Sequence, residues 1–176
     1  QMKHLLLIML PGVMLLATSC YKCTEKREVS KLTPRYMSDD ELKSSIKMEN
    51  QRAISTVGKI YFKDDYIYIS DPGKGIHVID NKDPRAPQNI GYVTVPGNTE
   101  LAVKNSTIIA NNATDLVSIN MEDPRNPVVT GRLNGAFPFE MPTDQSRSKQ
   151  YVTPDLSKGI VVGWNEKVVV EESPCY

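Results

Sequence analysis

The chain has few of the side chains that carry chemistry in enzymes, with two histidines, three cysteines and one tryptophan among 176 residues. A zinc site needs three or four clustered histidine, cysteine or acidic ligands, and no such cluster occurs. There is also no glycine-rich phosphate loop, no Gly-x-Ser-x-Gly turn and no paired cysteine and histidine. The sequence therefore indicates no catalytic residues, no metal site and no cofactor.

Two weaker chemical candidates have structural explanations that we favour. His77 lies within an apolar run, which favours a structural role over that of a base or ligand. Asp64, Asp65 and Asp71 could approach one another across a hairpin and hold Ca²⁺, although such acids are also typical of solvated turns.

An excess of charge of one sign is missing as well. The chain carries 21 basic and 21 acidic residues, for a formal net charge of zero. Nucleic-acid binding depends on a positive potential that neutralises phosphates, so we expect no nucleic-acid partner.

Long apolar runs are absent except near the N-terminus, where residues 5–17 follow Lys3 and His4. A membrane-spanning helix needs roughly 20 apolar residues, and this shorter run is interrupted by Pro11. The pattern predicts a signal peptide over residues 1–19. This signal belongs either to a lipoprotein or, as the alternative, to an ordinary secreted protein with an incidental cysteine at position 20.

Residues 16–20, Leu-Ala-Thr-Ser-Cys, resemble the bacterial lipobox. This resemblance implies that Cys20 is acylated, becomes the mature N-terminus and anchors the chain to a membrane. We expect an outer membrane lipoprotein of the cell envelope, facing either the periplasm or the cell exterior. In that oxidising compartment Cys23 and Cys175 could form a disulfide, or remain two unrelated thiols.

After the cysteine, residues 20–37 are polar and charged, and predict a flexible tether between the lipid and the folded part. Residues 38–57 follow as a short helix and a connection. Ser38 and Glu41 have the spacing of a capping box, which predicts a helix over about residues 39–48.

An internal repeat with an offset of 40 residues covers residues 58–137. Asp83, Pro84 and Pro87 of the first unit, residues 58–98, align with Asp123, Pro124 and Pro127 of the second, residues 99–137. A gapless alignment also places Tyr68 over Ile108. We assign these aspartates to turn initiation and the prolines to ending strand pairing.

Each unit contains four β-prone runs separated by turn residues. The runs are residues 59–62, 66–70, 76–80 and 89–95, then 101–104, 107–111, 116–120 and 128–133. Four strands repeating every 40 residues or so is the period of a β-propeller blade. The sequence predicts an all-β fold of propeller-like blades, each of four short antiparallel strands.

The strand, turn and Asp-Pro-x-x-Pro pattern, with cores at residues 76–80 and 116–120, resembles the LVIVD repeat of bacterial envelope proteins. The layout as a whole resembles the N-terminal part of such lipoproteins from Bacteroidetes. The resemblance implies a propeller scaffold and carries no common catalytic residue.

Residues 138–176 lack the Asp-Pro-x-x-Pro turn, and predict a loop followed by a partial or divergent third blade with strands at residues 159–164 and 167–170. Trp164, beside a turn, is either a ligand-stacking platform or, as we favour, a half-buried strand residue.

Closure of a propeller takes at least about four blades. We therefore expect an incomplete propeller, whose exposed flank is covered by missing downstream blades, by self-association or by a partner.

These features predict a non-enzymatic cell-envelope lipoprotein whose repeat scaffold binds a protein or a glycan. The alternative is a propeller-type hydrolase or lyase that acts on glycans with paired carboxylates. The first strands of the two units, residues 59–62 and 101–104, offer lysine and no acid, which favours the non-enzymatic interpretation.

Overall fold

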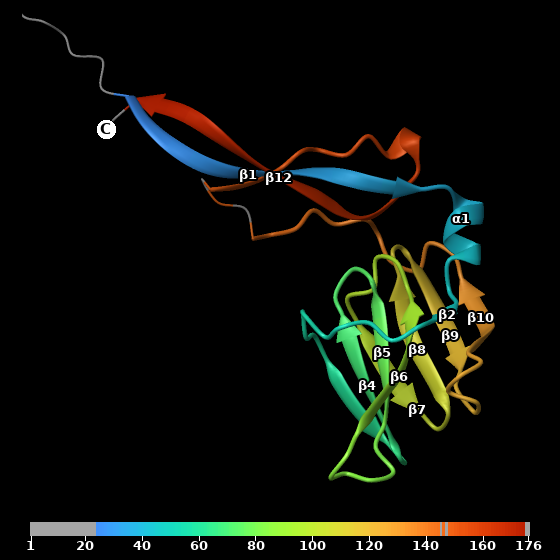
Figure 1. Ribbon diagram of the computed structural model, residues 1–176. Coiled ribbons are helices and arrows are strands. Elements are labelled where there is room, and N and C mark those ends of the chain that lie inside the picture. Colours follow the sequence, from blue (N-terminus) through green and yellow to red (C-terminus); the bar gives the residue numbers. More distant parts are fainter. Residues whose placement is uncertain (1–23, 145, 147, 175–176) are drawn as a thin grey trace, which may run out of the picture.

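The computed structural model describes residues 24–174 except 145 and 147, and it confirms the all-β class (Figure 1). Twelve strands form three sheets, joined by the short helix α1 (Asp39–Ser44) and a 3-10 turn at Leu156–Lys158. No helix in the described part of the chain is long and apolar enough to cross a membrane. The predicted signal peptide over residues 1–19 lies outside the described residues, as do Cys20, Cys23 and Cys175.

The two repeat units form two antiparallel sheets in which consecutive strands are neighbours. Sheet 1 has the order β2-β6-β5-β4-β3 and sheet 2 the order β10-β9-β8-β7. Their strands are β2 (Met48–Glu49), β3 (Ile60–Lys63), β4 (Tyr66–Asp71), β5 (Gly75–Asp80), β6 (Gln88–Thr94), β7 (Leu101–Lys104), β8 (Thr107–Asn112), β9 (Asp115–Asn120) and β10 (Val128–Leu133). All eight strands predicted in the repeat are present, each ending within one residue of the prediction.

Alternate residues along each strand point to opposite sides, so the apolar residues of each sheet can share one face. Sheets 1 and 2 pack face to face through these apolar faces. We call the face that each sheet turns toward the other its inner face. The core lies between them, with Ile76 and Val78 of sheet 1 and Ile108 and Ile119 of sheet 2 fully buried. Leu101, Val117, Val93 and Tyr68 complete this apolar layer.

The Asp-Pro turns have the same geometry in both units. The Asp83 carboxylate accepts a 3.0 Å bond from the backbone N–H of Arg85, and Asp123 accepts one of 3.0 Å from Arg125. Each aspartate carbonyl also accepts from the N–H three residues later, at 2.9 Å in both turns. Proline at the second position suits this turn because its φ is already fixed. The last prolines of the motif, Pro87 and Pro127, directly precede β6 and β10.

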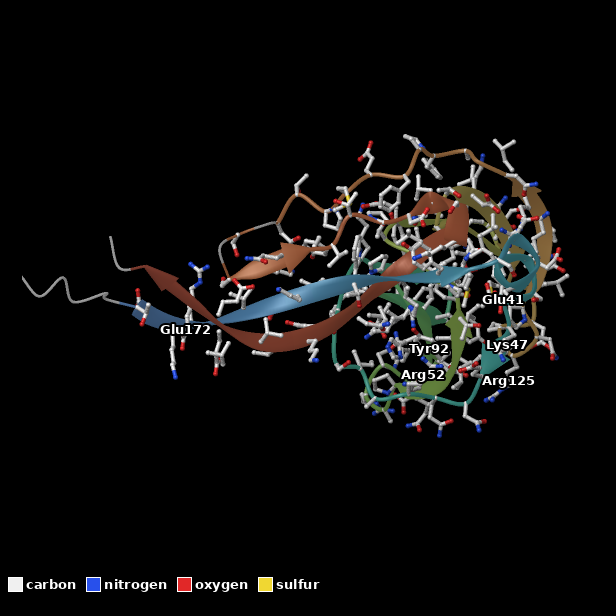
Figure 2. The ribbon with its side chains drawn as sticks, turned by 90° about the horizontal axis from the view of Figure 1, so that it is seen from above. Glu41, Lys47, Arg52, Tyr92, Arg125 and Glu172 are labelled. Carbon is white, nitrogen blue, oxygen red and sulfur yellow. The ribbon has the colours of Figure 1, made fainter. Side chains whose placement is uncertain are left out.

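The predicted flexible tether is wrong for residues 24–37, which form the long strand β1 (Thr24–Met37). Its partner is β12 (Ile160–Pro174), and the two make an antiparallel ribbon whose far end, with Glu172, projects from the body (Figures 1 and 2). Ion pairs cross the ribbon from Lys31 to Glu171 at 3.0 Å and from Lys26 to Glu172 at 3.8 Å. The charges that suggested a tether are thus cross-strand partners.

The predicted third blade is also wrong. Residues 149–151 form β11 (Lys149–Tyr151), which pairs with β1, so the third sheet has the order β11-β1-β12. The sequence suggested two strands near residues 159–170, but these residues belong to the single strand β12. No four-stranded unit forms here because the partner of β12 comes from the N-terminal end of the described chain.

The capping box of the helix is confirmed. Ser38 Oγ accepts from the backbone N–H of Glu41, and the Glu41 carboxylate accepts from the backbone N–H of Ser38 at 2.8 Å. Leu42 is the buried residue of the helix. The helix ends at Ser44, earlier than predicted, because Met48 pairs with Val93 as the edge strand of sheet 1.

Thr24 pairs with Pro174 at the end of the described ribbon. The disulfide between Cys23 and Cys175 stays a prediction, because both cysteines lie outside the described residues.

The matched turns predict matched responses to substitution. Replacing Pro84 or Pro124 with Ala should lower the free energy of unfolding by about 1 kcal/mol in each case, because proline restricts the unfolded chain at a compatible position. Chemical denaturation of both variants measures this. A silent effect at one turn and a severe one at the other would contradict the structural equivalence of the two units.

Candidate ligand-binding groove

A groove of about 580 Å³ lies where the hairpin turns of sheets 1 and 2 meet the start of β12. One side is formed by turns of the two repeat units and the other by residues 137–143 and 161–164. The residues that line it include Gly73, Gly97, Thr99, Glu100, Asn111, Ala113, Thr114, Phe137, Phe139, Glu140, Met141 and Trp164.

The floor of the groove is a close contact between two turns. Gly97 has φ of 73° and Ala113 has φ of 54°, so both occupy the left-handed region. A Cβ on Gly97 would lie 2.8 Å from the Cα of Ala113, which leaves no room for a side chain. Gly97 also donates its N–H to the carbonyl of Gly73 at 3.0 Å, which joins the turns of sheet 1 to this contact.

Two asparagine side chains form hydrogen bonds to the backbone of the same turns. The Asn111 side-chain oxygen accepts from the backbone N–H groups of Thr99 at 2.9 Å and Glu100 at 2.8 Å, and its amide donates to the Gly97 carbonyl at 3.0 Å. Asn98 is fully buried and donates to the Glu100 carbonyl at 2.9 Å. Because these bonds satisfy buried polar groups on both sides, the floor is rigid.

The wall of the groove is aromatic and apolar, with Phe137, Phe139, Met141 and Trp164. The backbone N–H of Phe137 donates to the Thr114 carbonyl at 2.9 Å, which fixes the wall to the second hairpin. Trp164 lies in β12 and is half-buried. It is therefore a strand residue, as favoured from the sequence, and it also lines the groove.

Tyr151 of β11 holds the Trp164 ring in place. The two rings meet edge to face, with centroids 4.8 Å apart and an interplanar angle of 82°. Such contacts contribute about 0.5–1.5 kcal/mol beyond the burial of area. The groove thus combines a pre-arranged aromatic wall with a polar floor, a composition suited to binding apolar or planar groups.

Two carboxylates lie at the groove. Glu100 forms an ion pair with Lys59, which directly precedes β3, and Glu140 is exposed. Glycan hydrolysis by two carboxylates requires them to flank one bond, with one of them protonated.

His77 is buried on the opposite side of sheet 1 from the core. Its ring meets that of Tyr92 edge-on, with centroids 4.9 Å apart, and neither ring nitrogen has a hydrogen-bond partner. Burial lowers the pKa of His77, which keeps the ring neutral. Full burial fits the structural role that the sequence favours, although no described residue accepts or donates a hydrogen bond at the ring.

Polar neighbours surround this histidine. The Tyr92 hydroxyl donates to Asp71 at 3.3 Å, Asp71 pairs with Lys74 at 3.3 Å, and the Arg52 guanidinium lies 4.2 Å from the centre of the Tyr92 ring (Figure 2). Burial and then the Asp71 charge raise the pKa of Tyr92.

A second, wide depression of about 790 Å³ is lined by Arg52 and Arg125. The Arg52 charge is already paired with Glu49.

The suggested calcium site is not formed. Asp64 and Asp65 precede β4 whereas Asp71 ends it, and a strand of this length separates its ends by about 17–20 Å. Within residues 24–144, 146 and 148–174, no group of three or more His, Cys, Asp or Glu side chains is placed to hold a metal ion.

Sequence reasoning identified Trp164 but missed the rest of the wall. Phe137 ends the second repeat unit and Phe139 lies in the predicted loop that follows it. The loop is confirmed for the described residues among 138–148, but predicting a loop does not reveal that these side chains line a groove. Two of the three phenylalanines of the chain lie within three residues there, and that concentration in a loop is the signal that could have marked the site.

Comparisons of the chain with models of protein families, with curated proteins and with solved structures find no match. Its function is therefore argued from the groove and from the sequence motifs.

Proposed function

We propose that this chain is a non-enzymatic lipoprotein of the bacterial cell envelope, in which the repeated sheets are a scaffold and the aromatic groove binds a protein or glycan partner. The lipid on Cys20 anchors it to the outer membrane, on the periplasmic face or at the cell surface. The observation that carries the proposal is the groove itself, with its fixed floor and its wall of Phe137, Phe139 and Trp164.

The groove combines repeated segments with segments outside the repeat, and this arrangement supports a binding role. The groove floor comes from turns of the two repeat units, whereas the wall comes from residues 137–143 and 161–164, which have no counterpart in the repeat. Binding sites commonly lie on loops held by a rigid scaffold. A site built in this way can take a specific ligand without any change in the scaffold.

The scaffold is proposed to be of the β-propeller type, similar to that of LVIVD-repeat lipoproteins. Three features support this: a period of about 40 residues, four consecutive antiparallel strands in each unit, and the packing of one unit on the face of the next. The glycan-cleaving alternative has less support, because Glu100 at the groove is held by Lys59.

Membrane attachment can be tested at the lipidation site. Cys20→Ala should move the protein from the membrane fraction to the soluble fraction of its native host, because no acyl chains can be added. Cys23→Ala is the matched control and should remain in the membrane fraction. Retention of Cys20→Ala in membranes would rule out the lipoprotein interpretation.

Partner binding can be tested by placing a photoreactive phenylalanine analogue at Phe139 in cells. We expect a discrete cross-linked product there, and a several-fold weaker one when Trp164→Ala removes part of the wall. The matched probe at Val168, which is 58% exposed on the ribbon, should give no such product. Digestion of the product with a protease or with glycosidases separates a protein partner from a glycan.

The Trp164→Ala variant must also keep its fold, which a thermal melt of the purified protein verifies. Equal cross-linking at positions 139 and 168, or a product that Trp164→Ala leaves unchanged, would contradict binding in the groove.

A further inference from the structure

The outer face of sheet 1, which points away from sheet 2, is apolar and is uncovered over β3 and β4. Ile60 and Phe62 of β3 are 59% and 65% exposed, and Ile67 and Ile69 of β4 are half-buried beside them. A single sheet face of this kind is normally covered, because exposed strands with apolar side chains promote association.

The segment between β2 and β3 covers only part of this face (Figure 1). It crosses the side of β5 and β6, where the Arg52 guanidinium stacks on Tyr92 and the Arg52 backbone carbonyl accepts a 3.0 Å bond from the Asn89 side chain. It adds two more exposed apolar residues, Ile54 and Val57, and leaves β3 and β4 open.

The hairpins show which positions of the two units are equivalent. In sheet 1 three residues separate Asp71 from its partner Gly75, whereas in sheet 2 two residues separate Asn112 from Asp115. The first two strands of the units therefore correspond at an offset of 41, and the last two at an offset of 40. The gapless alignment at 40 residues is wrong for the first two strands, and Tyr68 corresponds to Ile109.

With this correction, the outer face of sheet 1 corresponds to the buried inner face of sheet 2. Five positions are apolar in both. The equivalent pairs are Ile60 with Leu101, Phe62 with Val103, Ile67 with Ile108, Ile69 with Ala110, and Ile79 with Ile119. The uncovered face therefore has the residue pattern of a face that is buried elsewhere in the same molecule.

The outer face of sheet 2 corresponds in turn to the inner face of sheet 1. Ile109, Leu116 and Leu133 are the equivalents of Tyr68, Ile76 and Val93, which are buried in the core. In sheet 2, Ile109 is 37% and Leu133 61% exposed, and Leu116 is half-buried. Val128, at the other end of β10 on the same face, is 57% exposed. The two outer faces are thus the two complementary halves of the interface that already joins sheets 1 and 2.

We propose that copies of this chain associate head to tail, with the outer face of sheet 2 of one copy packed on the outer face of sheet 1 of the next. Over β3 and β4, which the chain's own segment leaves open, the contact repeats the packing between the two sheets within one copy. Head-to-tail contacts close into a ring when the rotation per copy allows it. Two copies supply four stacked sheets, the lower end of the range of roughly four to eight blades in propellers.

Native mass spectrometry of the detergent-solubilised full chain tests the proposal by counting copies. We expect a discrete assembly of two or more copies for the wild type. Phe62→Glu and Leu133→Glu, on different outer faces, should each reduce it to the monomer. Val170→Glu is the matched control, since Val170 is 62% exposed on the ribbon, and it should assemble as the wild type does.

Mixing the two face variants gives the sharper result. Phe62→Glu keeps an intact sheet 2 face and Leu133→Glu an intact sheet 1 face, so equimolar mixing should restore a pair with one copy of each. A circular dichroism spectrum of each variant confirms that it is folded.

Three results would overturn the proposal: a monomeric wild type, an assembly that only one of the two face variants disrupts, or an equal loss with Val170→Glu. The second would indicate a two-fold contact between identical faces. Stacking does not rest on lipidation or on binding in the groove, so its failure leaves the proposed function in place.

Discussion

The apolar layer between the inner faces of sheets 1 and 2 is the interaction on which the rest of the molecule depends. A repeat unit of one four-stranded sheet cannot bury its apolar face alone and depends on a neighbouring unit to cover it. Here Ile76 and Val78 meet Ile108 and Ile119, all fully buried. Full burial of each such side chain contributes about 1.5–3 kcal/mol. Each unit is therefore folded largely because the other covers it.

The same layer positions the groove. Packing of the two sheets brings the turn at Gly97 against the turn at Ala113, where only a glycine fits, and Asn111 then bonds across both. The aromatic wall attaches to this platform through Phe137 and through β12, whose partner β1 leads directly into α1 and sheet 1. The site is thus assembled from segments far apart in the sequence around one rigid contact.

Much of the fold could be predicted from local sequence, because alternation of apolar residues and the Asp-Pro turns reports on neighbouring strands. The ribbon could not, since β1 is polar and charged and becomes a strand only by pairing with β12 more than a hundred residues later. The equivalence of the two faces could not either, because the hairpins after Asp71 and Asn112 differ in length by one residue. This difference shifts the alignment of the first two strands by one position, which assigns their side chains to the opposite face. The groove depends on the ribbon and on the way the two sheets face each other, so only Trp164 could be identified from the sequence.

Native-state hydrogen exchange of an Ile108→Ala variant tests the shared layer most directly. The substitution leaves a cavity on the sheet 2 side and should cost about 2–5 kcal/mol. If the layer is shared, the slowest amides of β5 in sheet 1 and of β9 in sheet 2 will lose the same protection free energy, because both open in one cooperative unit. Loss of protection confined to β9, with β5 unchanged, would contradict the account.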